Sequence, residues 1–542
     1  MTNFADGDPA LKPLLDRLLT AEDRARVEPF LAELGELAAG ELDRLARTAD
    51  ASPPRLVQYA PDGERIDEVE FHPAYDRMAQ IAFERFGLAA MSHRPGVLGW
   101  PSAVPHVVKY ALSYVFVQAE FGLACPVSMT DSAARVLRLF DRERYAPEIA
   151  ALTSTDLADH ATGAMFMTEI DAGTDVGRTE TTAADHGTHW TLSGRKWFCS
   201  NVSADIILTL ARVPGQGDGT KGLGLFLLPR RRPDGTRNSY RIDRLKDKLG
   251  SRSMASGEVT LTGAYARPVG ELKDGFRQMA EMVNVSRLSN AMRAAALMRR
   301  AVHESVEHVR RREVFGKPLL EQPLMRATLL PLILDAEAGL GLVLESAAQL
   351  DRADAGSADA KGLVRILTPL AKYTLCKQAR HVTAEAMEIR GGNGYIEDWV
   401  NPRLLRDAHL GSIWEGSSNV IALDVLRCLR REGAHRVLAA EYLSRLAALD
   451  LPGTAEVTRR WHALRDEGEE LLGQPPDAQQ VLIAPYATGM ARAVMATLLL
   501  EQAAFESQRG DGERKLLVAT AYVSGSGAAL PVLLNRLETV AG

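Results

Sequence analysis

The chain has 542 residues, enough for three or four domains of ordinary size. Hydrophobic residues make up 46% of the chain and charged residues 25%, proportions typical of an ordinary soluble globular protein. The formal net charge of −6 argues against a protein that binds nucleic acid over its whole surface, although a local basic patch is still possible.

The four cysteines are scattered, with no paired spacing. This pattern indicates buried small side chains in a reducing compartment, not a disulfide framework or a metal site. The first residues contain no basic segment followed by an apolar core, and the sequence has no run of about 18 apolar residues, so we expect a cytoplasmic protein. The cysteines are Cys125, Cys199, Cys376 and Cys428.

Residues 1–162 are predicted to form an N-terminal helical domain. Apolar residues recur there at three- and four-residue spacing in residues 11–20, 28–48 and 132–139. Proline and Asp-Gly clusters at residues 52–54 and 61–63 interrupt the pattern.

Residues 163–272 are predicted to form a small middle β domain. Aromatic-rich segments lie on either side of Ser193-Gly194, which is a hairpin signal. The glycine-rich residues 215–219 are interpreted as a hairpin loop, because no helix follows them as a dinucleotide fingerprint requires. Short apolar or alternating runs predict further strands at residues 206–210, 223–228 and 258–262.

Residues 273–432 are predicted to form a helical bundle. An apolar stripe over residues 275–312 predicts one long helix of about 55 Å. Two further helices are predicted at residues 324–352 and 359–390, and another after Ser418. Residues 433–542 are predicted to add a C-terminal helical domain. Helices, a small sheet and a long bundle together indicate an α+β fold.

The segment Ser-Ile-Trp-Glu-Gly-Ser-Ser-Asn at residues 412–419 is the strongest candidate for chemistry. Trp414 gives Glu415 the apolar neighbour that makes a carboxylate a better base, and Gly416 lets another group approach the backbone closely. An alternative interpretation is a helix start, in which Ser417 caps the apolar run that follows.

Five segments in this order resemble the acyl-CoA dehydrogenase family of flavoproteins. Trp-Glu-Gly-Ser at residues 414–417 resembles the segment whose glutamate removes the substrate α-proton. The resemblance covers roughly residues 70–430. The other four segments are Met-Thr-Glu-Ile-Asp-Ala-Gly-Thr-Asp-Val at 167–176, Gly-Arg-Lys-Trp-Phe-Cys-Ser-Asn at 194–201, Arg-Glu-Val-Phe-Gly-Lys at 312–317 and Gly-Gly-Asn-Gly-Tyr at 391–395.

The resemblance implies FAD as cofactor, an acyl-CoA thioester as substrate and Glu415 as the catalytic base. Some members carry this base one residue before an arginine of the long helix, but that position is Ser286 here, and a hydroxyl cannot take the proton. The residues expected to contact the cofactor are Met167, Thr168, Gly173, Thr174, Phe198, Ser200, Arg312, Phe315, Gly391, Gly392, Trp414, Ser417 and Asn419. Among these, Arg312 and Phe315 are expected to reach the FAD of a neighbouring subunit.

Some of these residues can also be interpreted as purely structural. Phe198 could be an ordinary core aromatic of a hairpin, and Arg312 could end a solvated helix with a favourable dipole. The sequence also departs from the family at three places. Pro323 and Glu388 each stand where the family usually has a glutamine, the second of them before the Gly-Gly turn, and Ile170-Asp171 stands in place of the usual Pro-Gly. These departures concern the outer contacts of the cofactor.

Ser-Pro-Pro at residues 52–54, Phe-His-Pro-Ala at 71–74 and the segment 244–252 resemble the AidB-type branch of the family. That branch implies a homotetramer, induction by alkylating agents, weak dehydrogenase activity and association with DNA. Residues 430–542 carry 12 basic against 14 acidic residues, so they are not a basic domain. The local cations are Arg427, Arg430, Arg431 and Arg436. An acyl-CoA oxidase, reoxidised directly by oxygen, is a further alternative, and the sequence identifies neither the acyl chain nor the electron acceptor.

Overall fold

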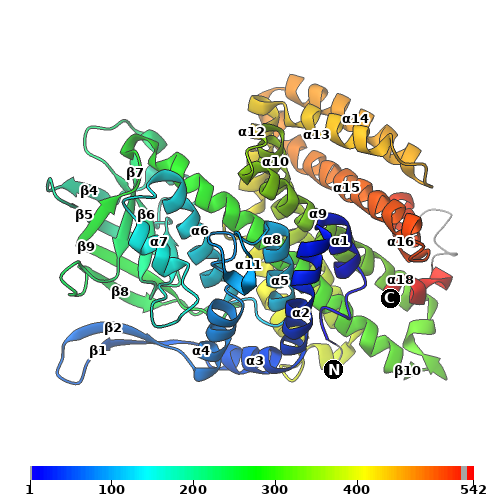
Figure 1. The fold of residues 1–542 in the computed structure, drawn as a ribbon, viewed down its shortest axis with the longest axis horizontal. Helices are drawn as coiled ribbons and strands as arrows, with labels where there is room; N and C mark the ends of the chain where they lie inside the picture. The colour runs from blue at the N-terminus through cyan, green and yellow to red at the C-terminus, as the bar shows by residue number, and fades with distance from the viewer. Residues whose placement is uncertain (1–2, 526–533) are drawn as a thin grey trace. The chain divides into compact units, whose positions relative to one another are not determined.

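The computed structural model describes residues 3–525 and 534–542. The chain divides into two units (Figure 1). The first, called here the helical unit, contains residues 1–40, 106–119 and 287–542. The second, called the sheet unit, contains residues 41–105 and 120–286. The predicted C-terminal domain includes residues 526–533, which lie outside the described residues.

The helical unit is built around long helices whose apolar residues are spaced as the sequence predicted. The predicted long helix is α8 (Gly275–Arg311), which is assigned to the helical unit from Arg287 onward. Helix α10 packs against α9, α11 and α12. The helices before the C-terminal region are α1 (Leu11–Leu18), α2 (Ala21–Leu37), α5 (His106–Val117), α9 (Pro323–Asp354), α10 (Ala358–Ile389), α11 (Asn401–Gly411) and α12 (Ser418–Glu432).

The C-terminal helices are joined to α9 by buried ion pairs. Glu337 pairs with Arg514 at 2.6 Å and also with Lys515, while Glu345 pairs with Arg445 at 2.7 Å. Burial raises the pKa of Glu337, but the two cations outweigh it and lower the pKa to about 2. These helices are α13 (Ala434–Leu446), α14 (Thr454–Gly473), α15 (Pro476–Arg509), α16 (Arg514–Ser524) and α18 (Leu537–Ala541).

Two helices within the described residues, α9 and α15, are long and apolar enough to cross a membrane. Helices of this kind were not predicted from the sequence. Most of the apolar stretch is buried inside the fold, 78% in α9 and 61% in α15. Core helices of globular proteins pass the same test, and α9 also carries the buried Glu337 and Glu345.

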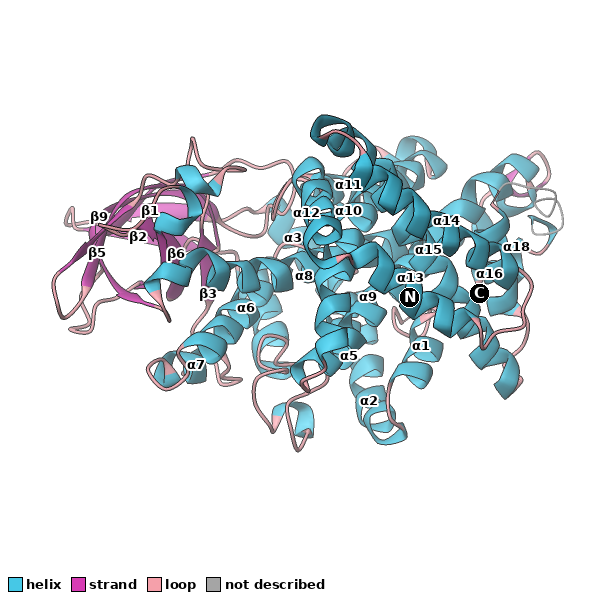
Figure 2. Ribbon diagram, turned by 90° about the horizontal axis from the view of Figure 1, so that it is seen from above, coloured by secondary structure: helices cyan, strands magenta, loops and turns pink. Residues whose placement is uncertain are grey.

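The sheet unit contains a mixed sheet of seven strands within the described chain, gathered together in Figure 2. Strand β7 pairs with both β9 and β6, so the strand order returns on itself around a core that includes Phe166, Leu192 and Phe226. The strands are β3 (Gly163–Phe166), β4 (Thr182–Asp185), β5 (Trp190–Ser200), β6 (Ile206–Arg212), β7 (Leu223–Pro229), β8 (Tyr240–Leu245) and β9 (Ser256–Pro268). Helix α6 (Ala124–Phe140) packs against β3, and α7 (Ala146–Leu152) follows it.

The predicted hairpin at Ser193-Gly194 is wrong, whereas the hairpin loop at residues 215–219 is confirmed between the antiparallel strands β6 and β7. Strand β5 runs unbroken through Gly194, with only a register shift against β9 at Leu192/Ser193. A Cβ at position 194 would lie 2.7 Å from the Cα of Thr181. Gly194 therefore marks a close approach of two backbones, not a turn.

A β-hairpin in the sheet unit was not predicted. Strands β1 (Arg55–Tyr59) and β2 (Arg65–Glu70) form an antiparallel ribbon between helices α3 (Asp43–Ala51) and α4 (Pro73–Ala79), visible in Figure 1. The Asp-Gly pair interpreted as a helix break lies in the turn of this hairpin, where Gly63 has φ +90°.

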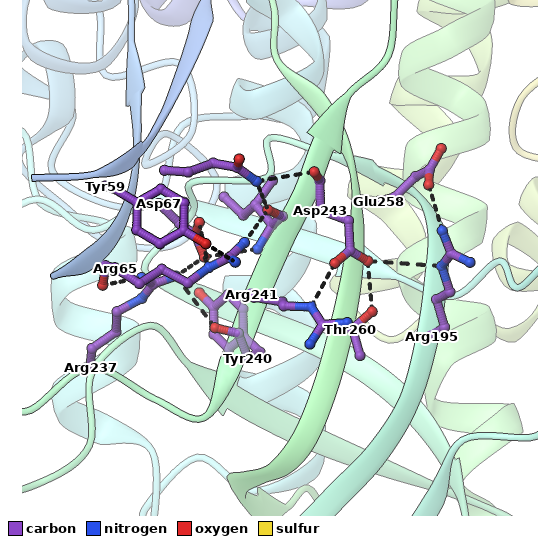
Figure 3. A network of polar contacts seen from close by, with 12 residues as sticks. Tyr59, Arg65, Asp67, Arg195, Arg237, Tyr240, Arg241, Asp243, Glu258 and Thr260 are labelled. Carbon is purple, nitrogen blue, oxygen red and sulfur yellow. Dashed lines mark hydrogen bonds and ion pairs between the residues drawn. The ribbon is translucent and has the colours of Figure 1, made fainter. Parts of the chain in front are cut away.

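Asp67 anchors this hairpin to strand β8, as Figure 3 shows. Its carboxylate is fully buried and accepts hydrogen bonds from Arg65 Nε at 3.0 Å, from the backbone N–H of Ile242 at 3.0 Å, and from the guanidinium of Arg237. Asp67 has a left-handed backbone with φ +41°, a conformation that aspartate and asparagine tolerate better than most residues. One buried carboxylate therefore fixes the position of the ribbon on the sheet.

Replacing Asp67 by asparagine should test this anchor. Asparagine keeps the shape and the tolerated backbone but removes the charge, so we expect a loss of about 2 kcal/mol, as for hydrogen bonds to charged groups. The measurement is thermal unfolding against Glu68→Gln, an exposed carboxylate next to it. Equal midpoints for the two variants would contradict the anchoring role.

Candidate functional site

Glu415 lies in the short connection between α11 and α12, with an unusual backbone. Its φ is +57° and that of Gly416 is +99°, so two consecutive residues are left-handed. Glycine adopts this conformation freely, but for a glutamate it costs about 1–3 kcal/mol and persists only where the surroundings hold it. Strained backbone of this kind is concentrated at functional sites, which makes Glu415 a candidate on the geometry alone.

Three side chains from two helices hold the backbone carbonyls of this connection. From α8, Asn290 Nδ2 donates to Gly411 O at 3.0 Å, and Arg287 Nε donates to Glu415 O at 3.0 Å. From α10, Lys372 Nζ donates to Gly416 O at 2.5 Å. These bonds hold the connection at both of its ends.

Several positive charges lie around the connection. Arg287 also pairs with Asp424 at 2.8 Å, and Arg365 pairs with the same carboxylate at 2.8 Å. Burial raises the pKa of Asp424, but the hydrogen bond from Arg365 and the two cations outweigh it and hold the pKa below its usual range. Burial lowers the pKa of Lys372, and the charge of Glu415 opposes that effect. The guanidinium of Arg293 lies 4.5 Å from the centre of the Trp414 ring.

Ser417 stands at the start of a helix, as the alternative interpretation predicted, but it makes no capping hydrogen bond within the described residues. Ser417 is the N-cap residue of α12 and has an extended backbone, but its side chain caps no donor within the described chain. Ser417 and Asn419 are both exposed. Their polar groups therefore lie at the protein surface, two and four residues after Glu415 in the sequence.

In the sheet unit, the two predicted flavin segments are hydrogen-bonded to each other. The backbone N–H of Trp197 donates to Thr168 O at 2.8 Å. Met167 and Thr168 are half-buried at the end of β3, whereas Gly173 and Thr174 are exposed beyond a tight turn.

A buried ion pair locks these two segments together. Lys196 of β5 is fully buried, and its Nζ lies 2.7 Å from Glu169 Oε1. The carboxylate also accepts from the hydroxyl of Thr181 at 2.5 Å and from the N–H of Glu180 at 2.7 Å. Burial raises the pKa of Glu169, but the charge of Lys196 and these hydrogen bonds outweigh it and hold the pKa below its usual range. Neither Glu169 nor Lys196 was predicted from the sequence to have a role.

Phe198 and Ser200 are neighbours on β5 with different surroundings. Phe198 is 56% exposed, which excludes the interpretation as an ordinary core aromatic. Lys246 Nζ lies 4.8 Å from the centre of the Phe198 ring and 3.4 Å from that of Trp197. Ser200 Oγ is half-buried, 3.5 Å from the hydroxyl of Ser256. An exposed aromatic face next to hydroxyl groups is a surface that a flat, polar ring system can contact.

Arg312 and Phe315 belong to a small hairpin of the helical unit. Strands β10 (Glu313–Val314) and β11 (Lys317–Pro318) pair across a two-residue turn in which Phe315 has φ +50° and Gly316 φ +78°. The turn leaves Phe315 96% exposed, and Arg312 is exposed as well.

The Gly-Gly turn follows α10 as a 3₁₀ turn over Gly391–Gly394. Gly391 and Gly392 are exposed, with open space where a Cβ would be. Of the departures, Pro323 begins α9 and Glu388 is exposed. Gln322 donates from Nε2 to Val314 O at 3.2 Å, so it supports the small hairpin.

The structure thus places most of the predicted residues in two groups, each within one unit, whereas Arg312, Phe315, Gly391 and Gly392 lie on separate turns of the helical unit. Trp414, Glu415 and Ser417 lie in one connection and Asn419 lies in the first turn of α12, while Thr168 lies beside the strand that carries Phe198. The three donors to the connection were not predicted from the sequence. A signal existed for Lys372, because it is the charged residue in the otherwise uncharged stretch of residues 366–376.

Comparisons with known proteins identify the class. The profile of the acyl-CoA dehydrogenase middle domain matches residues 164–264, and that of the acyl-CoA dehydrogenase C-terminal domain matches residues 273–429. The profile of the adaptive response protein AidB N-terminal domain matches residues 1–159. The chain belongs to the acyl-CoA dehydrogenase family, a family of flavoprotein oxidoreductases, and has the AidB-type N-terminal domain.

The chain is 35% identical to the putative acyl-CoA dehydrogenase AidB of Escherichia coli, over 84% of this chain and 83% of that protein. It is 34% identical to acyl-CoA dehydrogenase family member 11 of Caenorhabditis elegans, over 80% of this chain and 71% of that one. The crystal structure of Caenorhabditis elegans ACDH-11 in complex with C11-CoA is similar with a TM-score of 0.88 at 29% identity, covering 96% of this chain and 91% of that one. These matches confirm the predicted family and fold.

The buried pair between Glu169 and Lys196 should make stability depend on pH. Because the pKa of Glu169 is depressed in the folded state, the pair contributes stability above the pKa of an unfolded glutamate, about 4.3, and this contribution is lost as the pH falls below it. Lys196→Met alone should cost about 3 kcal/mol by leaving Glu169 unpaired.

The matched comparison is the double variant Glu169→Gln with Lys196→Met. It removes both charges of this pair, so we expect it to be more stable than the single Lys196→Met variant and to lose less stability between about pH 5 and pH 3 than the wild type. Thermal unfolding of the cofactor-free proteins measures both effects. If the stability of the wild type and that of the double variant depended on pH in the same way, the role of the Glu169–Lys196 pair would be contradicted.

Proposed function

We propose that the protein is an FAD-dependent acyl-CoA dehydrogenase in which Glu415 is the catalytic base. The observation that carries this proposal is the backbone of Glu415, held in a left-handed conformation by Arg287 and Lys372. A base must be fixed relative to the proton that it removes, and a strained, anchored carboxylate meets that requirement. Membership of the acyl-CoA dehydrogenase family supports the same role.

FAD fits the chemistry of the residues present. Exposed Phe198 offers an aromatic face, and the hydroxyls of Ser200 and Thr174 offer hydrogen-bonding groups. Exposed Arg312 suits a pyrophosphate, because a guanidinium forms paired, charge-assisted hydrogen bonds. When bound, the flavin supplies a two-electron acceptor for hydride at N5. The remaining proposed contacts are Met167, Thr168, Gly173, Phe315, Gly391, Gly392, Trp414, Ser417 and Asn419.

The proposed reaction removes two hydrogens from neighbouring carbons of an acyl-CoA thioester. The carboxylate of Glu415 takes the α-proton, and the electrons of that C–H bond become available for the α,β double bond. FAD, if bound, would supply the acceptor for the β-hydrogen as hydride. The similar structure of Caenorhabditis elegans ACDH-11, which contains C11-CoA, supports an acyl-CoA as the substrate class. Dependence on a separate electron acceptor would distinguish this enzyme from the alternative, an acyl-CoA oxidase, which would release peroxide.

The homotetramer, the cytoplasmic location and the association with DNA stay predictions. For DNA, three of the four candidate arginines bind side chains of this chain. Arg427 pairs with Asp424 at 3.1 Å, Arg430 donates to Gln479 at 2.6 Å, and Arg436 pairs with Glu469. Binding through such a patch requires an affinity that falls steeply with salt concentration. The dehydrogenase is therefore the better-supported function.

Glu415→Gln tests the proposal directly. Glutamine keeps the size of the side chain but cannot take the proton, so we expect the variant to retain FAD and to lose at least about 10³-fold in the rate of flavin reduction. The measurement is an anaerobic titration with short, branched and long acyl-CoAs, following bleaching of the oxidised flavin band. Glu470→Gln, an exposed glutamate of α14, is the control. Bleaching of the Glu415→Gln variant at the wild-type rate would refute the role.

A further inference from the structure

We propose that Lys372 is a positioning residue for Glu415: its ammonium group fixes the backbone after Glu415 and its charge favours the ionised carboxylate. The proposal rests on the proposed role of Glu415 as the base. Lys372 is 1% exposed on α10, and its Nζ lies 2.5 Å from Gly416 O.

Burying the ammonium group of Lys372 costs free energy, which argues against a purely structural role. Its neighbours Leu370, Ala371 and Leu375 on α10 are fully buried, so the ammonium group is desolvated. A methionine would fill the same space without that penalty, because burying an ammonium group costs several kcal/mol. A buried charge that binds a neutral carbonyl is better explained by an electrostatic effect on the nearby carboxylate.

The geometry explains how Lys372 acts on the conformation of Glu415. Arg287 binds the carbonyl of Glu415 and Lys372 binds the carbonyl of Gly416, so the two peptide planes that flank Gly416 are both held. Gly416 has φ +99°, and a Cβ there would lie 3.1 Å from Ile421. Without the second bond, the peptide after Gly416 is free to rotate, and the left-handed backbone of Glu415 loses one of its two restraints.

The other charged and titratable groups around the connection come from four helices. Arg287 and Arg293 lie on α8, Cys376 and Arg380 lie on α10 with Lys372, and Asp424 lies on α12, while Arg365 of α10 and Arg427 of α12 are bound to Asp424. His409 near the end of α11 accepts, through its backbone carbonyl, from the hydroxyl of Ser412. Because Arg287 is paired with Asp424, its charge is partly neutralised, whereas Lys372 binds a neutral carbonyl. Removing Lys372 should therefore change the electrostatic potential at the carboxylate of Glu415, in addition to breaking the hydrogen bond to Gly416 O.

The test compares Lys372→Met, Lys372→Arg and Lys377→Met in the holoenzyme. Lys377 lies five residues further along α10 but is exposed, and its Nζ lies 3.4 Å from the hydroxyl of Tyr373, so it is the matched control. We expect Lys372→Met to lower kcat by about 10- to 100-fold with little change in KM, as for loss of positioning. We also expect the acid limb of its profile of kcat/KM against pH to move to higher pH by about one unit, since the ionised form of the base loses the stabilising charge of a nearby cation. Lys372→Arg keeps the charge and should keep the acid limb near its wild-type position.

Hydrogen–deuterium exchange of the peptide containing residues 411–417 gives a readout that does not depend on activity. It should be faster in Lys372→Met than in Lys377→Met. An acid limb that coincides with that of Lys377→Met would overturn the proposal whatever the exchange shows, because a merely structural role would not move it. If Lys372→Met does not fold, Lys372→Gln replaces it with the same expectations. Activity that survives in Glu415→Gln would instead refute the base, and the exchange comparison would still decide whether Lys372 anchors the connection.

Discussion

A buried carboxylate must be matched by a cation or by several N–H donors, and this requirement decides which segments lie together throughout the protein. Asp67 joins a hairpin to strand β8, Glu169 joins two neighbouring segments of the sheet unit, and Glu337 joins α9 to the C-terminal helices. Asp424 takes three arginines, one of which also binds the backbone of Glu415. The candidate base is thus attached to the same kind of pair that holds the rest of the fold.

Around Glu415, the connection combines strain with fixed positive charge. A left-handed glutamate is unfavourable by itself, and the donors from α8 and α10 compensate for this by binding consecutive carbonyls. Both helices are long and packed in the bundle, so the donors start from rigid positions. A site held in this way needs little reorganisation when its carboxylate changes charge, which is the property that electrostatic preorganisation requires.

The sequence predicted those features that repeat along the chain or sit within one short motif. The long helices α8, α9 and α10 follow from apolar periodicity, and Glu415 follows from its local sequence. Gly194 and the Asp-Gly pair at residues 62–63 were misinterpreted, because the same residue types serve turns, close approaches and helix ends. The contact of Lys372 with Gly416 joins residues 44 positions apart, and a single sequence contains no signal that pairs them.

The ion pairs of Glu337 limit how this chain can vary in length. Both of its cations, Arg514 and Lys515, come from the first two residues of α16, close to the C-terminal end of the chain. A protein of the same fold that ended before α16 would keep the glutamate in the bundle and lose both partners. Selection would then favour a neutral residue at the position of Glu337, so the identity of this α9 residue and the presence of the last helices should change together across related sequences.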